Sequence, residues 1–342
     1  MQNDETSLNH HSMPPRRRFL RALLGGKPDR TPAGNVVSVA TVEQMRLTDA
    51  WFPEAHTDSQ KMALLAAAGH EILGFDTVMP VFSVIQEAAA LGCALSWGGP
   101  LEMPTVRSHP FADMDEFALP EGWIDSPPIQ VVLEALRLLR QRVGADAAIV
   151  GKVMGPWTLS YHMMGVEEFL IATKKDPGRA VRSMECLMEA TMAFARLQIM
   201  AGADVICLAD HATGGMISPI AYRDLLMPLH RRIFSRINAP TVLHCCGNTS
   251  DRVKYFAECG VDCYHFESGV NLESAVADAR DKITLMGNIN NMEVLLNGKP
   301  EDVRAACRRA KEAGVQILSP ECAVPLNTPL ENLRAIVEAA QE

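Results

Sequence analysis

The sequence predicts a single (β/α)8 TIM barrel, and three observations support this fold class. Eight short, β-branched apolar runs alternate with longer segments in which apolar residues have helical spacing. Runs that are apolar throughout are typical of parallel strands covered on both faces. No Gly-x-Gly-x-x-Gly follows the first strand, which disfavours a doubly wound sheet. A closed barrel accommodates all eight strands within 342 residues.

The order of the expected elements follows from these patterns. The predicted strands are residues 35–41, 75–80, 147–155, 203–210, 240–247, 261–268, 283–288 and 316–320. The predicted helices are residues 60–73, 83–91, 129–143, 179–201, 221–238, 250–259, 272–279, 300–313 and 330–340. Gly202, Gly260 and Gly314 each follow a predicted helix and precede a predicted strand. Glycine at this position supplies the left-handed residue that ends a helix.

Two segments fall outside the alternation. Residues 1–13 are polar and are expected to form a disordered tail. Residues 92–128 are rich in glycine and proline, so we expect an insertion or lid near 92–128 within one catalytic barrel domain spanning 14–342.

Charge and hydropathy disfavour nucleic acid and membranes as partners, and they bear on the roles of the cysteines. The chain has 32 basic and 41 acidic residues and a net charge of −9, which disfavours a nucleic-acid partner. No apolar run reaches the ~18 residues of a membrane helix, and the N-terminus lacks the apolar core of a secretory signal. A cytoplasmic location is therefore expected. The nine cysteines then serve as packing residues, metal ligands or nucleophiles.

Side chains that can bind metal ions (His, Cys, Asp and Glu) and other polar side chains occur at the ends of the predicted strands. The active sites of barrel enzymes lie at this carboxyl-terminal rim. The residues at these strand ends are Asp210, His211, His244, Cys246, Glu267, Asn288 and Cys322.

The sharpest motif is the run His244-Cys245-Cys246. On a strand, His244 and Cys246 face one side while Cys245 faces the other. Cys322 follows the last predicted strand and can approach them across the mouth of the barrel. One imidazole and two thiolates leave a fourth position open, as in catalytic zinc sites. A buried histidine with two packed cysteines is the alternative.

A four-cysteine knuckle is a competing arrangement. It would combine Cys245 and Cys246 with Cys259 and Cys263. Cys259 closes a predicted helix and Cys263 lies inside a predicted strand. These positions do not converge, so the knuckle is disfavoured.

Several segments of the chain resemble the uroporphyrinogen decarboxylase superfamily, and within it the methylcobamide:coenzyme M methyltransferase branch. The segments that carry this resemblance are residues 18–32 (RFLRALLGGKPDRTP), 52–58 (FPEAHTD), 69–74, 201–210 (AGADVICLAD), 241–248 (TVLHCCGN), 287–289 and 319–332 (SPECAVPLNTPLEN). The resemblance implies a (β/α)8 barrel and catalytic zinc held by His244, Cys246 and Cys322. It also places Glu267 near the metal, where it can fill the fourth position until the substrate arrives.

The reaction that this resemblance implies is methyl transfer from a methylated corrinoid, protein-bound or as free methylcobalamin, to a thiol such as coenzyme M. Zinc would keep the small thiol substrate deprotonated at neutral pH. The chain lacks the Asp-x-His-x-x-Gly of corrinoid modules, so we expect a separate corrinoid protein as partner. Asp210 joins Glu267 as a candidate catalytic residue, and Asn288 and His211 are candidates for cofactor binding. Lys152 is a weaker candidate for contacting a sulfonate or carboxylate on the acceptor.

Three alternatives remain open at this point. A tetrapyrrole decarboxylase of the same superfamily holds substrate carboxylates with arginines on the loop after the Asp-Arg-x-Pro segment. Here residues 29–32 (DRTP) are followed by no arginine until Arg46. A corrinoid methyltransferase with tetrahydrofolate as acceptor and a non-catalytic corrinoid- or tetrapyrrole-binding chaperone are the others. Bound zinc would separate the transferase from the decarboxylase and the chaperone.

Overall fold

The computed structural model describes residues 12–279 and 281–342. The predicted disordered tail lies outside these residues except for Ser12 and Met13. The backbone N–H of Met13 donates to Asp29 Oδ2 at 2.8 Å, so this end of the tail is tied to the barrel.

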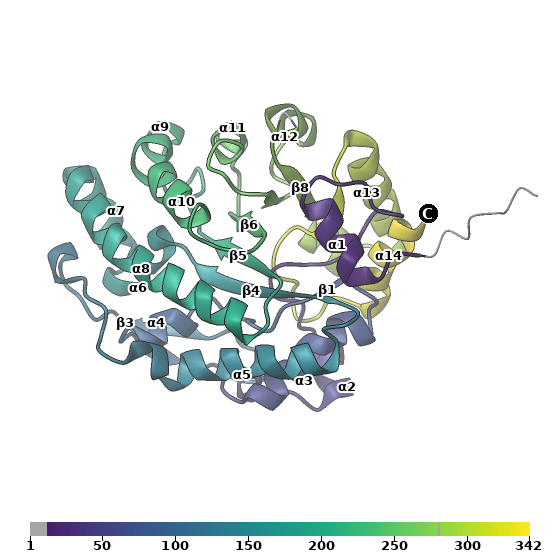
Figure 1. Cartoon of the computed structure of the whole chain (residues 1–342), viewed down its shortest axis with the longest axis horizontal. Helices are drawn as coiled ribbons and strands as arrows, with labels where there is room; N and C mark the ends of the chain where they lie inside the picture. The colour runs from purple at the N-terminus through teal and green to yellow at the C-terminus, as the bar shows by residue number, and fades with distance from the viewer. Residues whose placement is uncertain (1–11, 280) are drawn as a thin grey trace, which may run out of the picture.

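The central feature is a ring of parallel strands, seen near the middle of the molecule in Figure 1. Seven strands lie in the order β1-β4-β5-β6-β7-β8-β9, each hydrogen-bonded to the next. Their bounds are β1 Thr77–Val78, β4 Ala148–Met154, β5 Val205–Ala209, β6 Thr241–His244, β7 Cys263–Phe266, β8 Thr284–Ile289 and β9 Ile317–Pro320. Seven of the eight predicted strands are therefore present, with slightly shorter bounds.

The eighth position in the ring is occupied by residues 32–34. Gly34 N–H donates to Leu318 O of β9 at 3.0 Å, and Asp76 N–H, just before β1, donates to Ala33 O at 2.7 Å. These bonds connect β9 to β1 and close the barrel, which confirms the predicted fold class. The strand predicted at 35–41 was misplaced, because there the chain turns at Asn35, whose Oδ1 accepts from Val36 N–H at 2.8 Å.

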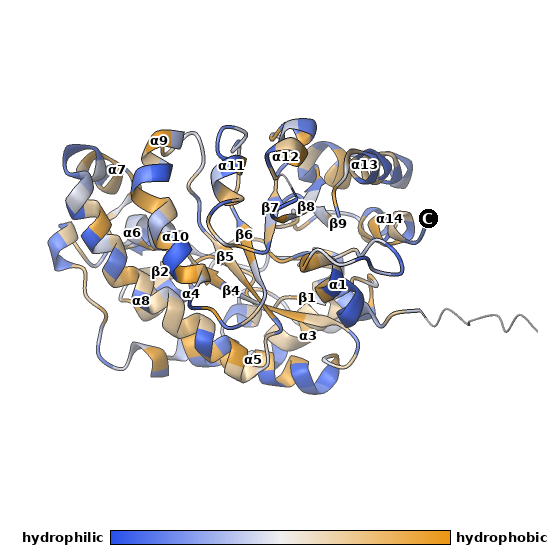
Figure 2. Cartoon of the chain, turned by 45° about the horizontal axis from the view of Figure 1, so that its top comes forward, coloured by the Kyte–Doolittle hydropathy of each residue, from blue (hydrophilic) through white to orange (hydrophobic). Residues whose placement is uncertain are grey.

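Helices cover the outside of the ring (Figure 1). Those that match predicted helices are α3 Ser59–Glu71, α4 Gln86–Ala90, α5 Pro127–Arg142, α8 Pro177–Ala201, α9 Pro219–Ala221 continued by a π-helix and α10 Met227–Phe234, α11 Val253–Phe256, α12 Leu272–Ala279, α13 Pro300–Ala313 and α14 Leu330–Gln341. The sequence did not delimit α1 Pro15–Leu23, α2 Val42–Thr48, α6 Pro156–Met164 or α7 Val166–Lys175. Figure 2 shows the pattern behind this packing, with apolar strands inside and polar outer faces on the helices. No helix among the described residues combines the length and apolar character needed to cross a membrane.

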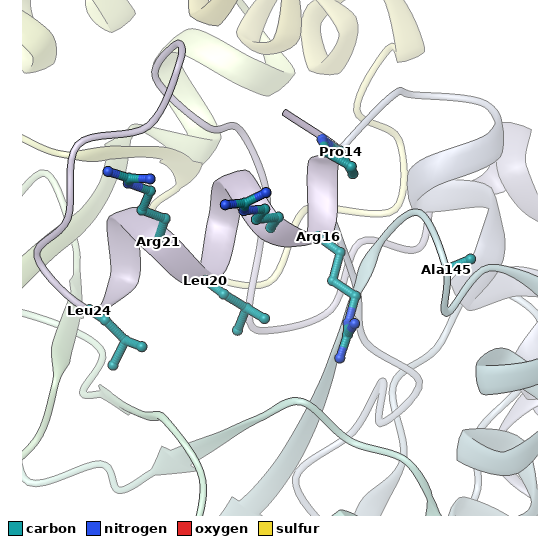
Figure 3. Close-up of a pocket in the computed structure, with 7 residues that line it drawn as sticks. Pro14, Arg16, Leu20, Arg21, Leu24 and Ala145 are labelled. Atoms are coloured by element: carbon teal, nitrogen blue, oxygen red, sulfur yellow. The ribbon is translucent and has the colours of Figure 1, made fainter. Parts of the chain in front are cut away.

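Helix α1 lies against the amino-terminal end of the barrel. Arg16 N–H donates to Asp146 O, just before β4, and Thr284 Oγ1 at the start of β8 donates to Ala22 O. A cavity of about 520 Å³ borders this helix and is lined by Pro14, Arg16, Arg17, Leu20, Arg21, Leu24 and Ala145. Figure 3 shows these side chains. The cavity lies at the opposite end of the barrel from the histidine and cysteines of the predicted metal site.

The segment predicted as an insertion or lid carries a small hairpin of its own. Strands β2 Ala94–Ser96 and β3 Thr105–Ser108 pair antiparallel and form a sheet separate from the barrel. Two 3-10 helices, Met114–Glu116 and Trp123–Asp125, follow before α5 begins. The hairpin turn carries Met103 and Pro104 to a cavity at the carboxyl-terminal mouth.

A buried histidine beside this mouth makes stability dependent on pH. The ring of His56 stacks on Phe52 with centroids 4.1 Å apart, and neither ring nitrogen has a hydrogen-bond partner among the described residues. Burial, and secondarily the charge of Lys152, lowers the pKa of His56 from 6.5 to about 4. The unfolded chain therefore binds the proton first, so the contribution of His56 is complete above pH 6.5 and declines toward pH 4.

Replacing His56 with phenylalanine is expected to weaken the acid sensitivity of the fold. Between pH 7.5 and pH 5 the wild type should lose about 2 kcal/mol more unfolding free energy than His56→Phe. Urea unfolding at the two pH values measures this difference. Equal losses in both proteins would show that His56 is not held neutral in the folded state.

Candidate metal centre

Three predicted ligands meet at the carboxyl-terminal mouth of the barrel. His244 is the last residue of β6, Cys246 lies two residues further on, and Cys322 follows the end of β9. His244 Nε2 lies 2.9 Å from Cys246 Sγ and 3.4 Å from Cys322 Sγ, and the two sulfurs are 3.3 Å apart. Residues 78 positions apart in the chain are thus brought into contact by the closure of the barrel.

The neighbouring cysteines do not join this cluster. Cys245 is buried and lies outside the cluster, as the alternation predicted. The thiol of Cys259 donates to Phe256 O at 3.1 Å, and Cys263 lies inside β7. Within the described chain, His244, Cys246 and Cys322 form the group of metal-type side chains whose donor atoms all lie within 4.8 Å of one another. The four-cysteine knuckle is not formed.

The donor set matches zinc in both chemistry and size. Zinc bonds of 2.0–2.3 Å in a tetrahedron separate two sulfurs by about 3.8 Å and a nitrogen from a sulfur by about 3.5 Å. The separations here are equal to these or shorter by less than about 1 Å, so a modest opening of the side chains accommodates the ion. Three protein ligands are the number found in catalytic zinc sites.

The two sulfurs of the cluster lie within hydrogen-bond distance, 3.3 Å apart. The hydrogen bond from Cys246, together with the nearby His244, holds the pKa of Cys322 well below its usual value. The same hydrogen bond and burial raise the pKa of Cys246. One sulfur of the pair is therefore already disposed to carry the negative charge that a soft cation prefers.

A second layer of side chains holds the ligands in place. His265 on β7 lies with its ring centroid 4.7 Å from that of His244, and its Nε2–H donates to Pro320 O at 2.8 Å. Glu321 accepts hydrogen bonds from the backbone N–H groups of Ser268 at 2.8 Å and Asn291 at 2.7 Å. These contacts fix the segment that carries Cys322. Sequence reasoning missed both residues, although Glu321 lies directly beside a predicted ligand.

Glu267 follows β7 and lies near the thiols without belonging to the three-ligand cluster. Burial raises its pKa, while the backbone N–H of Gly247 opposes this effect. A carboxylate that is partly desolvated next to two thiols is suited to approach a cation. Its assignment to the fourth position remains a prediction.

Asp210 lines the cavity and accepts hydrogen bonds from two helices, α6 and α10. Its carboxylate accepts from Thr158 N–H at 2.7 Å, from Thr158 Oγ1 at 2.9 Å and from Trp157 N–H at 3.4 Å, at the start of α6. His230 Nε2–H donates to Asp210 Oδ2, the oxygen that also accepts from Trp157, at 2.9 Å, and Tyr222 OH donates to His230 Nδ1 at 2.9 Å. With these partners, Asp210 positions α6 and α10 rather than presenting a free base.

The two residues predicted to bind a cofactor lie in different places. His211 lines the same cavity as the three ligands, and its backbone N–H donates to Thr158 Oγ1 at 2.8 Å. Burial lowers the pKa of its imidazole, which keeps the ring neutral. Asn288 lines a separate cavity with Ser268, Asn271 and Asn290. The structure therefore brings His211 to the ligands but not Asn288.

The three ligands line a cavity of about 250 Å³ that opens at the mouth of the barrel. Much of the wall is apolar and includes Met154, Tyr161, Phe82 and Val84. The polar lining includes Thr158, Asp210 and His211 besides the three ligands, together with one buried ammonium, that of Lys152. A small, partly apolar molecule with a thiol end can enter this space.

The fold and site together define a class: a (β/α)8 barrel with a His-Cys-Cys cluster at its carboxyl-terminal rim. Comparison with known proteins agrees. Residues 14–342 match the family described as Uroporphyrinogen decarboxylase (URO-D), and the chain belongs to this family.

Relatives with curated names point to one branch of the family. The chain is 34% identical over 331 residues to the Methylated-thiol--coenzyme M methyltransferase of Methanosarcina mazei, covering 96% of this chain and 90% of the relative. It is 32% identical to the Methylcobamide:CoM methyltransferase MtaA of Methanosarcina barkeri over 95% of this chain and 97% of the relative. A solved methyltransferase from Methanosarcina mazei superimposes with a TM-score of 0.93 at 32% identity, over 96% and 99% of the two chains. The branch expected from the sequence is confirmed, and its members are named as methyltransferases.

Proposed function

We propose that this protein transfers a methyl group from a methylated corrinoid to a small thiol, with zinc bound by His244, Cys246 and Cys322. The observation that carries the proposal is the convergence of these three donors, within 4.8 Å of one another, at the wall of an open cavity. The names of relatives aligned over nearly the whole chain support the same reaction.

The chain's own residues prepare the acceptor for this reaction. Zinc, when bound here, would keep the acceptor thiol as a thiolate at neutral pH. His244, Cys246 and Cys322 would hold the ion at the wall of the cavity, where the acceptor thiol can reach it. The acceptor sulfur then attacks the methyl carbon, the carbon–cobalt bond breaks, and its electron pair remains on the corrinoid as Co(I). The products are a thioether, the Co(I) corrinoid and the proton released from the thiol.

The corrinoid approaches from outside the barrel. A cavity of about 250 Å³ is smaller than the ~300–1,000 Å³ of sites for drug-sized ligands, so a macrocycle cannot be enclosed there. Around the mouth, Val84, Leu101 and Met103 are 45%, 61% and 43% exposed, which gives an apolar rim. We therefore propose that a separate corrinoid protein, or free methylcobalamin, presents its methyl group over this rim, where the 92–128 insertion acts as a lid.

The cavity disfavours a tetrapyrrole substrate, and the relatives' names bear on the choice of acceptor. A tetrapyrrole with several carboxylates would need a larger and more basic pocket than one with a single buried ammonium. The relatives' names favour coenzyme M over tetrahydrofolate as the acceptor.

The decisive experiment combines metal analysis with a methyl-transfer assay. We expect about one equivalent of zinc per chain, the number of ions that one three-ligand site holds. Methylcobalamin and 2-mercaptoethanesulfonate should yield the methyl thioether, followed by the absorbance change of the cobalamin. Removal of the metal by a chelator should abolish turnover, and added zinc should restore it. A metal-free protein with full activity would refute the proposal.

A further inference from the structure

Two of the three predicted ligands are cysteines whose sulfurs lie close enough to bond to each other. Cys246 Sγ and Cys322 Sγ are 3.3 Å apart. Tetrahedral zinc would hold two sulfurs about 3.8 Å apart. A disulfide bond is about 2.05 Å long, so in either case the sulfurs need to approach by only about 1–2 Å. Neither cysteine belongs to a strand, so this approach leaves the register of β6 and β9 in place.

Both sulfurs can be reached from the mouth of the barrel. Cys246 and Cys322 are half-buried, and they are the two cysteines that line the open cavity. Cysteines that respond to oxidants are accessible and adjoin a second thiol, and this pair meets both conditions. Cys186 is also half-buried, but it lies on α8 outside this cavity and its thiol donates to Phe117 O at 3.4 Å. The remaining cysteines are buried: Cys93, Cys207, Cys245, Cys259, Cys263 and Cys307.

A bond between these two sulfurs would dismantle the metal centre. The thiolate is the form of cysteine that binds a metal ion, and a sulfur in a disulfide no longer carries that charge. Of the three donors that lie within 4.8 Å of one another, His244 alone would remain. Zinc sites in proteins use three or four protein ligands, so a single imidazole would not retain the ion.

We propose that Cys246 and Cys322 form a redox switch, in which a hydroperoxide joins their sulfurs in a disulfide and so prevents zinc binding. One sulfur attacks the peroxide O–O bond, which breaks to give a sulfenic acid and an alcohol, or water from hydrogen peroxide. The other sulfur then displaces water from the sulfenic acid and forms the S–S bond. Two electrons pass from the sulfurs to the peroxide oxygens, and the two protons required come from the thiols, or from solvent where zinc has displaced them. A dithiol reverses the change by thiol–disulfide exchange.

The effect of this switch on turnover rests on the proposed function, whereas the disulfide rests on the geometry of the two cysteines. The first test therefore follows the thiols of the zinc-loaded wild-type protein during treatment with hydrogen peroxide. We expect two of the nine thiols to be lost. Tryptic peptides 237–252 and 312–334 should then be found joined, lighter by two hydrogen atoms than their sum. An unchanged thiol count would overturn the proposal.

Zinc and activity are measured on the same samples. About one equivalent of zinc should appear in solution, detected with a chromogenic chelator, as the cross-link forms. Methyl transfer should fall by at least about ten-fold, because the loss of groups that merely support a ligand already costs that much. Dithiothreitol followed by added zinc should restore the thiols, the bound metal and the rate. Complete cross-linking with zinc still bound would overturn the proposal.

Three variants identify the sulfurs that react. Peptide 237–252 contains both Cys245 and Cys246, so the cross-link should persist in Cys245→Ala. Cys186→Ala is the control for the other half-buried thiol and should match the wild type. Cys322→Ser should give no cross-link and should leave a sulfenic acid on Cys246 that dimedone traps. A cross-link that disappears in Cys245→Ala would overturn the assignment.

Separate readouts distinguish a failure of this inference from a failure of the proposed function. A protein that forms the cross-link, but shows no methyl transfer in its reduced form, would contradict the proposed function and support the disulfide. A protein that is active in methyl transfer, but whose two cysteines proceed to sulfinic or sulfonic acids without a cross-link, would overturn the switch alone. Both outcomes are read from peptide masses, which do not depend on turnover.

Discussion

Replacing Cys322 with alanine is expected to abolish zinc binding and to reduce methyl transfer from methylcobalamin to a thiol by more than about 100-fold. The estimate follows because loss of groups that merely support a ligand already costs about 10–100-fold in metal affinity or activity. Cys322 supplies one of three donors, and its sulfur lies 3.3 Å from Cys246 and 3.4 Å from His244. Zinc content by mass spectrometry and the rate of thioether formation measure the two effects.

Cys245→Ala is the matched control for this prediction. Cys245 is adjacent to a ligand and is also a cysteine, but it is buried and lies outside the cluster. It should retain zinc and activity while losing about 1 kcal/mol of stability, the usual result of shortening a buried side chain slightly. An unchanged rate in Cys322→Ala would remove the metal cluster from the mechanism.

Replacing Asp210 with alanine is expected to cost about 3–5 kcal/mol of unfolding free energy, the range for breaking a buried charged network. The substitution leaves Thr158, Trp157 and His230 without the carboxylate that accepts their hydrogen bonds. Chemical unfolding followed by circular dichroism measures the loss. The effect should be large because α6 and α10 both depend on this one side chain.

The conservative variant separates a positioning role from a catalytic one. Asp210→Asn keeps an acceptor for Thr158, and the imidazole of His230 can reverse its tautomer, so we expect most of the stability and activity to remain. The exposed Asp224→Ala should lie within about 0.5 kcal/mol of the wild type. A stable Asp210→Asn protein that has lost its turnover would show that the carboxylate takes part in the reaction.

The barrel was predictable because the apolar runs and helical patterns in the sequence occur in the order in which strands and helices alternate in the fold. Strands such as β4 and β5 are buried along their whole length, and an apolar run of that kind is visible in sequence. The closure between β9 and β1 was harder to place, since it depends on a single short segment at residues 32–34. Helix α6 was missed because its first turn is held by Asp210 and its last turn by Cys93 and His109, contacts between remote segments that periodicity does not reveal.

The sequence by itself determined the fold class, the family resemblance and the chemical identity of the three metal-type ligands. Alternation along β6 already placed His244 and Cys246 on one side. Only the tertiary structure decided that Cys322 meets them, that Asn288 does not, and that the carboxylate of Asp210 is already occupied. The physical reason is that side-chain chemistry is local, whereas distances and hydrogen-bond partners between remote segments are set by how the closed barrel packs.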